Sequence, residues 1–417
     1  MRHEVRTRQT HGGVDALGAV GRAVMSVASR RVSLVALAVV LVGSDAAANA
    51  SAMGTPLHGA APAAVVGASP DDAGSTVVAT SGSLFTINGA VTHEGTSAAG
   101  MLVNMRMING LFSDANPKTV WRWKYPDTGT WDPNRNTGEL IAALPTYHAY
   151  GVDAITVGLQ GGLPVRNATV EQTWNVSAFT RTGALKTDWM ERLDHVLTAA
   201  DALHMVVIVS LFYQAQDQRL ADDAAVVAAC DNVTDWLTTT GPHAPYRNVL
   251  VEVANEINST GYDRAVLTPD RVVELIQRIH DRSGGTLPVS TSFRGRSIPT
   301  AAVVAGSQYV LLHSSGLTAD QLAAAIATIR AMPEYTADPK PILVTEDGVS
   351  SAAPTVEDQL AKMDTALGAG AGWGYYDQGL PDYHTGFQTV PINWGITTPH
   401  KQAFFDRTAW WTSQPAG

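Results

Sequence analysis

The sequence predicts a single α/β domain in which eight strand-helix units form a (β/α)8 TIM barrel. From Phe85 onward, short apolar runs alternate with longer amphipathic runs, which is the element order of α/β proteins. The short runs are apolar at successive positions, as parallel strands buried on both faces require. Eight such units in about 330 residues fit one barrel with enlarged loops, and a doubly wound open sheet is the alternative.

Eight segments have the composition of buried strands. In chain order they are Met101–Ile108, Val152–Leu159, Met205–Phe212, Asn248–Asn255, Leu287–Phe293, Tyr309–His313, Pro341–Glu346 and Gly372–Asp377. Helical patterns with a 3.6-residue period lie between and after them, at 132–144, 189–200, 226–237, 272–279, 322–329, 356–367 and 399–411, with a short link after residue 297. The first helix is expected to begin at Asp132-Pro133, a capping residue followed by a first-turn proline.

A glycine-rich run tests the doubly wound alternative. In that fold a phosphate-binding glycine turn leaves a strand and enters a helix. The run at residues 368–374, GAGAGWG, instead enters the last predicted strand. This placement favours the barrel over the open sheet.

The N-terminal residues predict an export signal followed by a linker. Six arginines between residues 2 and 31 precede the apolar run 32–42, and small residues follow up to Ala50. An apolar run of this length is too short to span a bilayer, so residues 1–50 are interpreted as a cleaved signal peptide, with a membrane anchor as the alternative. Residues 51–82 mix Ala, Gly, Ser and Pro like a flexible linker, and 83–417 form the barrel. The mature protein is therefore expected to be secreted or periplasmic, without membrane contact.

Charge and cysteine content exclude several classes of function. With 28 Lys and Arg against 38 Asp and Glu, the formal net charge is −10, which offers no basic surface to nucleic acid. The single cysteine, Cys230, excludes an internal disulfide framework and a thiolate-only metal site. The motifs of zinc proteases, α/β-hydrolases and β-lactamases are absent. We therefore predict no nucleic-acid partner, no metal and no cofactor.

Two predicted strands end in a glutamate. The fourth strand reads LVEVANE and places Asn255 and Glu256 at its end, whereas the seventh reads PILVTEDG and places Glu346 before a turn. Reactive groups of a barrel gather at the carboxyl ends of its strands, so both side chains are expected to face one cleft. Two such carboxyls can cleave an acetal, one as proton donor and one at the anomeric carbon. The alternative is that each glutamate caps a helix or pairs with Arg106 or Arg294.

These residues resemble the retaining glycoside hydrolases of clan A, and glycoside hydrolase family 5 in particular. The resemblance rests on Asn255-Glu256, the Glu-Asp-Gly run that begins at Glu346, His313 at the end of strand six and Trp373 in strand eight. It implies a cellulase-like barrel with Glu256 as acid/base and Glu346 as nucleophile. It also implies that Asn255 binds the sugar 2-hydroxyl and that Trp373 lies under the sugar.

Three positions depart from the family pattern. The strand-six histidine is followed by Ser315 instead of a tyrosine two residues on, strand three ends at Tyr213 without a histidine, and strand two ends at Gln160 without an arginine. These departures keep a second reading open, a noncatalytic barrel that binds carbohydrate. An inverting hydrolase is the third reading, because sequence does not give the distance between the carboxyls.

The retaining mechanism also needs two different pKa values. A general acid must hold a proton near neutral pH, and a nucleophile must stay ionised. A guanidinium from Arg106 or Arg294 beside Glu346 would separate the two pKa values. Tryptophans and polar side chains in the loops would then hold the sugar by stacking and hydrogen bonding, although each ring could equally be packing.

The carbohydrate-binding prediction covers nine residues. They are Asn255, His313, Trp373, Arg106, Gln160, Tyr213, Trp174, Asp377 and Trp394. Long loops after strands one and two favour a pocket over an open groove. The sequence therefore predicts an exported retaining glycosidase that cleaves a β-linked glycoside, with exo action on small glycosides preferred to endo action.

Overall fold

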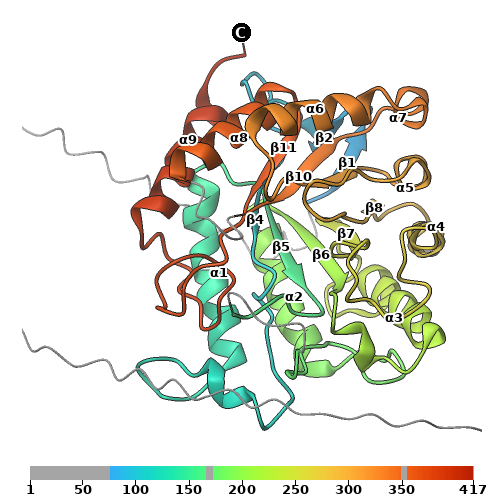
Figure 1. Cartoon of the computed structure of the whole chain (residues 1–417), viewed down its shortest axis with the longest axis vertical. Coiled ribbons are helices and arrows are strands. Elements are labelled where there is room, and N and C mark those ends of the chain that lie inside the picture. The colour runs from blue at the N-terminus through green and yellow to red at the C-terminus, as the bar shows by residue number, and fades with distance from the viewer. Residues whose placement is uncertain (1–75, 166–171, 349–354, 417) are drawn as a thin grey trace, which may run out of the picture. The chain divides into compact units, whose positions relative to one another are not determined.

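The computed structural model describes residues 76–165, 172–348 and 355–416, and an eight-stranded parallel sheet lies at its centre (Figure 1). The strands are β4 (Val103–Arg106), β5 (Ala154–Gly158), β6 (Val206–Phe212), β7 (Val249–Ala254), β8 (Val289–Ser290), β9 (Val310–His313), β10 (Ile342–Asp347) and β11 (Gly372–Tyr375). They pair in the order β8-β7-β6-β5-β4-β11-β10-β9, and every pairing is parallel. The predicted (β/α)8 barrel is confirmed.

The two ends of this sheet meet through Gln308. Its backbone N–H donates to the carbonyl oxygen of Val289 in β8 (3.1 Å), and its side-chain oxygen accepts from the Val289 N–H (3.0 Å). Gln308 lies just before β9, so these bonds connect the last strand in the sheet order with the first. The two hydrogen bonds bring the ends of the sheet together, so that the sheet forms a nearly closed barrel.

Helices surround the barrel (Figure 1). They are α1 (Pro133–Ala149), α2 (Thr187–Asp201), α3 (Asp223–Asp235), α4 (Val272–Arg282), α5 (Ala301–Gly306), α6 (Ala319–Arg330), α7 (Pro333–Ala337), α8 (Val356–Gly368) and α9 (Pro399–Ser413). The start predicted for α1 is confirmed, because the Asp132 side chain accepts from the N–H groups of Asn134 and Arg135 and Pro133 is the first helical residue. The link predicted after residue 297 contains α5. No helix of the described residues is long and apolar enough to cross a bilayer.

A small antiparallel sheet precedes the barrel and corrects the predicted linker. It consists of β1 (Val78–Ser81), β2 (Leu84–Ile87) and β3 (Ala90–Val91). β1 falls inside the predicted linker 51–82, so that boundary is wrong at its end: Val78 pairs with Ile87 and is buried. The predicted signal peptide and the linker up to residue 75 lie outside the described residues.

The strand side chains divide the core into two parts. Positions facing the helices, such as Val207, Val209 and Val251, belong to a large apolar cluster. Alternate positions facing the bore, such as Leu250 and Leu343, form a second cluster near the amino ends of the strands. Phe85 of β2 joins this second cluster, with its ring centroid 6.0 Å from that of Tyr309. The β1–β3 sheet therefore closes the floor of the barrel.

Candidate active site

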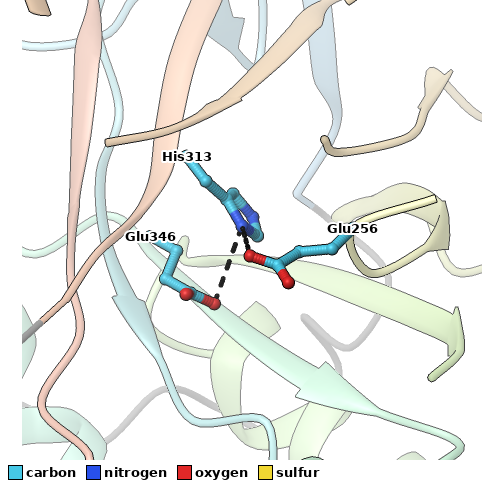
Figure 2. Close-up of side chains that lie close together, drawn as sticks. All are labelled: Glu256, His313 and Glu346. Atoms are coloured by element: carbon cyan, nitrogen blue, oxygen red, sulfur yellow. Dashed lines mark hydrogen bonds and ion pairs between the residues drawn. The ribbon is translucent and has the colours of Figure 1, made fainter. Parts of the chain in front are cut away.

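Glu256 and Glu346 face each other at the carboxyl ends of β7 and β10, with His313 between them (Figure 2). His313 Nδ1 lies 3.4 Å from Glu256 Oε1 and 3.7 Å from Glu346 Oε2. One carboxylate oxygen of each glutamate and the imidazole nitrogen all lie within 4.8 Å of one another. The glutamate side chains are 17% and 13% exposed, so solvent reaches both of them.

The backbone after β7 orients Glu256. This residue has a φ of 49°, in the left-handed region that costs a non-glycine residue about 1 kcal/mol or more. Ser292 holds this conformation: its hydroxyl accepts from the Glu256 N–H (2.9 Å), and its carbonyl accepts from the Ile257 N–H (2.9 Å). The loop after β8 therefore fixes the direction of the Glu256 side chain.

A bulge in β10 orients Glu346. The pairing of β10 shifts by one residue after Val344, so that Glu346 lies opposite His313 of β9 and Asp347 lies opposite Tyr375 of β11. Asp347 consequently turns outward, where it pairs with Lys362 of α8. Without the extra residue the alternation along the strand would exchange these two carboxylates. The bulge is what brings Glu346 to the site.

Arg106 connects the site residues across the bore. It is 1% exposed, its Nε lies 2.9 Å from Glu346 Oε2, and its Nη2 donates to Asn255 Oδ1. Asn255, itself buried, donates from Nδ2 to Gln214 Oε1 (2.9 Å). The cation expected beside Glu346 is therefore Arg106, whereas Arg294 is exposed and acts on Glu256 through its charge.

The pKa order of the pair is the reverse of the predicted one. Burial raises the pKa of Glu346 above its ordinary value, and the charges of His313 and Arg106 offset this only in part. Burial also acts on Glu256, but the hydrogen bond and charge of His313, with the charges of Arg106 and Arg294, outweigh it and lower the pKa of Glu256. The pKa of Glu346 therefore lies above that of Glu256. The arginine is placed as expected, but it does not produce the expected order.

The charges of the pair act on two buried tyrosines, and the hydroxyl of one of them, Tyr376, donates to Gln378 Oε1 (2.8 Å). Burial raises the pKa of Tyr213 and of Tyr376, and the negative charges of Glu346 and Glu256 raise both further. The ring of Tyr376 packs against Gly348, where a Cβ atom would lie 2.1 Å from the ring. Sequence reasoning found Tyr213 and missed Tyr376, which directly follows β11. Its signal was the alternation along that strand, which turns Gly374 and Tyr376 toward the bore.

The same alternation shows that the role predicted for Trp373 is wrong. Trp373 is fully buried outside the bore, where its Nε1 donates to Asp347 Oδ2 (3.1 Å) and its ring lies 5.5 Å from Phe404 of α9. The bore position next to it is Gly374, at which a Cβ atom would lie 2.8 Å from Asn104 Nδ2. No face of the indole is open to a sugar.

Gln160 holds the backbone next to the site through its side-chain amide. It is 1% exposed; its Oε1 accepts from the Tyr213 N–H (3.1 Å), and its Nε2 donates to the Gln216 carbonyl (3.0 Å) and to Ser177 Oγ (3.2 Å). These bonds fix the backbone that carries Tyr213. The predicted sugar contact is therefore replaced by a structural role.

The structure does not bring Trp174, Trp394 or Asp377 to the pair. Trp174 is 3% exposed and packs edge-on against Trp123. Trp394 is 2% exposed, and its Nε1 donates to a carbonyl of α1 (2.9 Å). Asp377 accepts from the Gly379 N–H (2.9 Å) within its own loop. Both rings are packing residues, as the alternative in the sequence analysis stated.

Glu256, His313 and Glu346 also form a set of possible metal ligands. Their ligand atoms are close enough to share one divalent ion. Glu346 Oε2, however, already faces the guanidinium of Arg106 at 2.9 Å, and this positive charge would repel a cation at the same oxygen. The site therefore fits an organic substrate better than a resident metal ion.

Fold and site together define the class: a (β/α)8 barrel with two glutamates opposed at the carboxyl ends of its strands. Among solved structures, this chain is similar to the endo-1,4-beta-mannanase from Rhizomucor miehei, with a TM-score of 0.51 and 11% identity over 81% of this chain and 99% of that chain. A second similar structure is a glycoside hydrolase with a TM-score of 0.51 and 10% identity over 81% of this chain and 73% of that chain. A family 5 glycoside hydrolase from Bacteroides vulgatus ATCC 8482 has a TM-score of 0.49 and 12% identity over 76% of this chain and 67% of that chain.

Sequence comparison adds nothing to this likeness. No family model matches the chain, and no curated protein matches it. At 10–11% identity, the likeness of the first two structures concerns the fold. It therefore confirms the predicted barrel fold, which these glycoside hydrolases share.

Proposed function

We propose that the protein is a retaining glycosidase that cleaves a β-linked glycoside by double displacement. The observation that carries this proposal is the distance between the glutamates, whose nearest ligand atoms lie within 4.8 Å. Retaining enzymes hold their two carboxyl groups about 5 Å apart, whereas inverting enzymes leave a wider gap for water. The glycoside hydrolases with the same fold support the substrate class.

In the first step, Glu346 attacks the anomeric carbon and the bond to the leaving oxygen breaks. Glu256 gives its proton to that oxygen, so the leaving group departs as a neutral alcohol and a covalent glycosyl-Glu346 ester remains. In the second step, water attacks the same carbon and gives a proton to Glu256. The bond to Glu346 breaks, and a sugar of unchanged anomeric configuration is released.

The neighbouring side chains have distinct parts in these steps. Arg106, 2.9 Å from Glu346, stabilises the carboxylate that is consumed in the first step and restored in the second. His313 lies between the two carboxyls, with Nδ1 3.4 Å from Glu256 Oε1 and 3.7 Å from Glu346 Oε2, and holds them in place relative to each other. Because His313 and the nearby arginines lower the pKa of Glu256, this residue must take up its proton when a sugar binds.

A glycan panel and one variant test the proposal. The wild-type protein should release nitrophenol from at least one aryl β-glycoside, and Glu346→Ala should abolish this release. Added azide should then restore turnover by taking the place of the missing carboxylate, giving a glycosyl azide of inverted configuration. NMR of the first product anomer separates the retaining reaction from an inverting one. Sugar binding with no turnover on any panel member would support the noncatalytic carbohydrate-binding barrel instead.

Chain-end preference and export are further parts of the proposal. An exo-acting enzyme releases single sugars from the start of the reaction, whereas an endo-acting enzyme first produces a ladder of oligosaccharides from β-glucan or β-mannan. Chromatography of early products distinguishes the two. We also propose that residues 1–50 direct export and are removed; N-terminal sequencing of protein from the culture medium or periplasm would locate the cleavage.

A further inference from the structure

A third carboxylate, Glu252, lies inside the barrel next to the proposed catalytic pair. It belongs to β7, the strand that leads to Glu256, and its side chain is 0% exposed. Its neighbours across the sheet are Ser210 of β6 and Ser290 of β8. Arg106 Nη1 lies 3.6 Å from its Oε2, and this is the one ion pair that Glu252 makes within the described residues.

Packing does not explain this carboxylate. Leu250, two residues earlier on the same strand, faces the bore and fills it with apolar atoms. A buried ion pair must offset the cost of removing both charges from water, and apolar side chains of similar volume commonly do better. A glutamate is also poorly matched to its surroundings, since neither of its oxygens accepts a hydrogen bond from the described part of the chain. Its charge is therefore the property that needs an explanation.

The guanidinium of Arg106 gives that explanation. Its Nε faces Glu346, its Nη2 donates to Asn255, and its Nη1 faces Glu252. A planar guanidinium presents these N–H groups in fixed directions, so a charge held at Nη1 also fixes where Nε points. Glu252 thus acts on Glu346 in two ways, through the orientation of Arg106 and through its own negative charge.

From this geometry we infer that Glu252 is a positioning residue. It keeps the Arg106 guanidinium oriented toward the nucleophile Glu346, and its negative charge partly cancels the positive charge of Arg106 at Glu346. The inference rests on the proposed function, in which Glu346 is the nucleophile. Glu252 touches neither sugar nor reacting atoms in this role. The electrostatic effect of Glu252 agrees with this role, because its negative charge raises the pKa of Glu346 and so opposes the effect of Arg106.

The test is Glu252→Gln, which keeps the shape and removes the charge. We expect kcat to fall roughly tenfold to a hundredfold, as small misplacements of catalytic groups do, with KM changed less than threefold. The acidic limb of the kcat/KM profile should move to lower pH, because Glu346 loses a negative neighbour. Ser290→Ala, on the adjacent strand, removes a buried hydroxyl without changing charge, and should leave the profile where it is.

A second measurement does not need turnover. In protein labelled with ¹³C at the glutamate carboxyl carbon, the Glu346 signal is identified by its loss in Glu346→Gln, and its titration midpoint should be lower in Glu252→Gln than in the wild type. An unchanged midpoint together with an unmoved acidic limb would overturn the inference. A purely structural role would lower the melting temperature without moving either quantity.

Two outcomes remain to be separated. If the wild type cleaves no glycoside, the proposed function fails, and the titration midpoint still decides whether Glu252 sets the charge of Glu346. If Glu252→Gln does not fold, Glu252→Asp keeps the charge but moves it away from Arg106. That variant should lose part of kcat while retaining the wild-type acidic limb, and a wild-type kcat would count against the positioning role.

Discussion

The floor and the upper layer of the barrel interior are built from the same strands but differ in chemistry. The floor consists of Leu250, Leu311, Leu343 and other apolar side chains, covered by the β1–β3 sheet. One step further along these strands, the bore holds Glu252, His313 and, through the bulge, Glu346 instead. The change from apolar to charged takes place over two or three residues.

The two layers contribute to different properties of the protein: the floor to its stability and the upper layer to its proposed reaction. Apolar burial in the floor favours folding, at about 25 cal/mol for each Å² removed from water. The upper layer gathers three carboxylates, Arg106 and His313, most of them buried, and each charge taken from water opposes folding. We therefore expect substitutions in the floor to act on stability and those in the upper layer to act on activity.

The largest expected effect is that of Glu346→Gln in the upper layer. Removing the nucleophile should lower kcat roughly 10⁴-fold or more, by comparison with other nucleophile knockouts. Its melting temperature should stay the same or rise, because a buried carboxylate is replaced by a neutral amide of similar size. Initial rates on an aryl β-glycoside and thermal unfolding measure the two quantities.

The matched control for this variant is Glu357→Gln, an exposed glutamate of α8. It makes the same chemical change and should leave kcat within twofold. A Glu346→Gln enzyme that turned over at the wild-type rate would remove the basis of the proposed mechanism.

The second effect belongs to the floor. Leu343→Ala removes fully buried side-chain atoms and should lower the free energy of unfolding by about 2–5 kcal/mol. The folded fraction should keep a kcat within about threefold of the wild type. Urea unfolding and active-site titration by a slow substrate measure these values. A loss of kcat without a loss of stability would contradict the separation between the two layers.

Much of this arrangement was predictable from the sequence because its signals are local. Apolar runs marked the strands, Asp132-Pro133 marked the start of α1, and the two glutamates were found because each ends a strand. The β1–β3 sheet was not recognised as a whole, since a four-residue strand such as Val78–Ser81 lies in a stretch with the composition of a linker.

The errors inside the site have one common cause, which is side-chain direction. The sequence does not reveal the bulge in β10, nor that β11 turns Gly374 inward and Trp373 outward. It equally does not reveal that Gln160 uses its amide to hold Tyr213. The pKa order depends on burial and on several charges at once, so the proximity of Arg106 alone could not predict it.

A third effect is the pH dependence of stability in the upper layer. Burial raises the pKa of Glu346 above the ordinary value of 4.5, so the folded state binds its proton more tightly than the unfolded state does. Well below pH 4.5, Glu346 is protonated in both the folded and the unfolded state, so its burial lowers the free energy of unfolding only slightly. As the pH rises above 4.5, the cost of ionising the buried group appears and stability falls. The stability difference between Glu346→Gln and the wild type should therefore grow with pH, as urea unfolding at several pH values can show. A difference that shrinks with rising pH would mean that Arg106 outweighs burial.

The smallest effects come from two aromatic residues, Trp373 within β11 and Tyr376 directly after it, and they test where the upper layer ends. Trp373→Phe loses the bond to Asp347 and part of the contact with Phe404, so unfolding should become easier by about 1–2 kcal/mol while KM changes less than twofold. Tyr376→Phe removes the hydroxyl that donates to Gln378 Oε1 (2.8 Å) and whose pKa the charges of the pair raise, and it should alter kcat or KM severalfold, although its effect on stability is small. A raised KM in Trp373→Phe with an unchanged Tyr376→Phe would restore the stacking role that the sequence predicted for Trp373. We expect the reverse, an unchanged KM in Trp373→Phe and a changed kcat or KM in Tyr376→Phe. This result would show that the side chains of this segment that face the bore belong to the site and that those facing the helices do not.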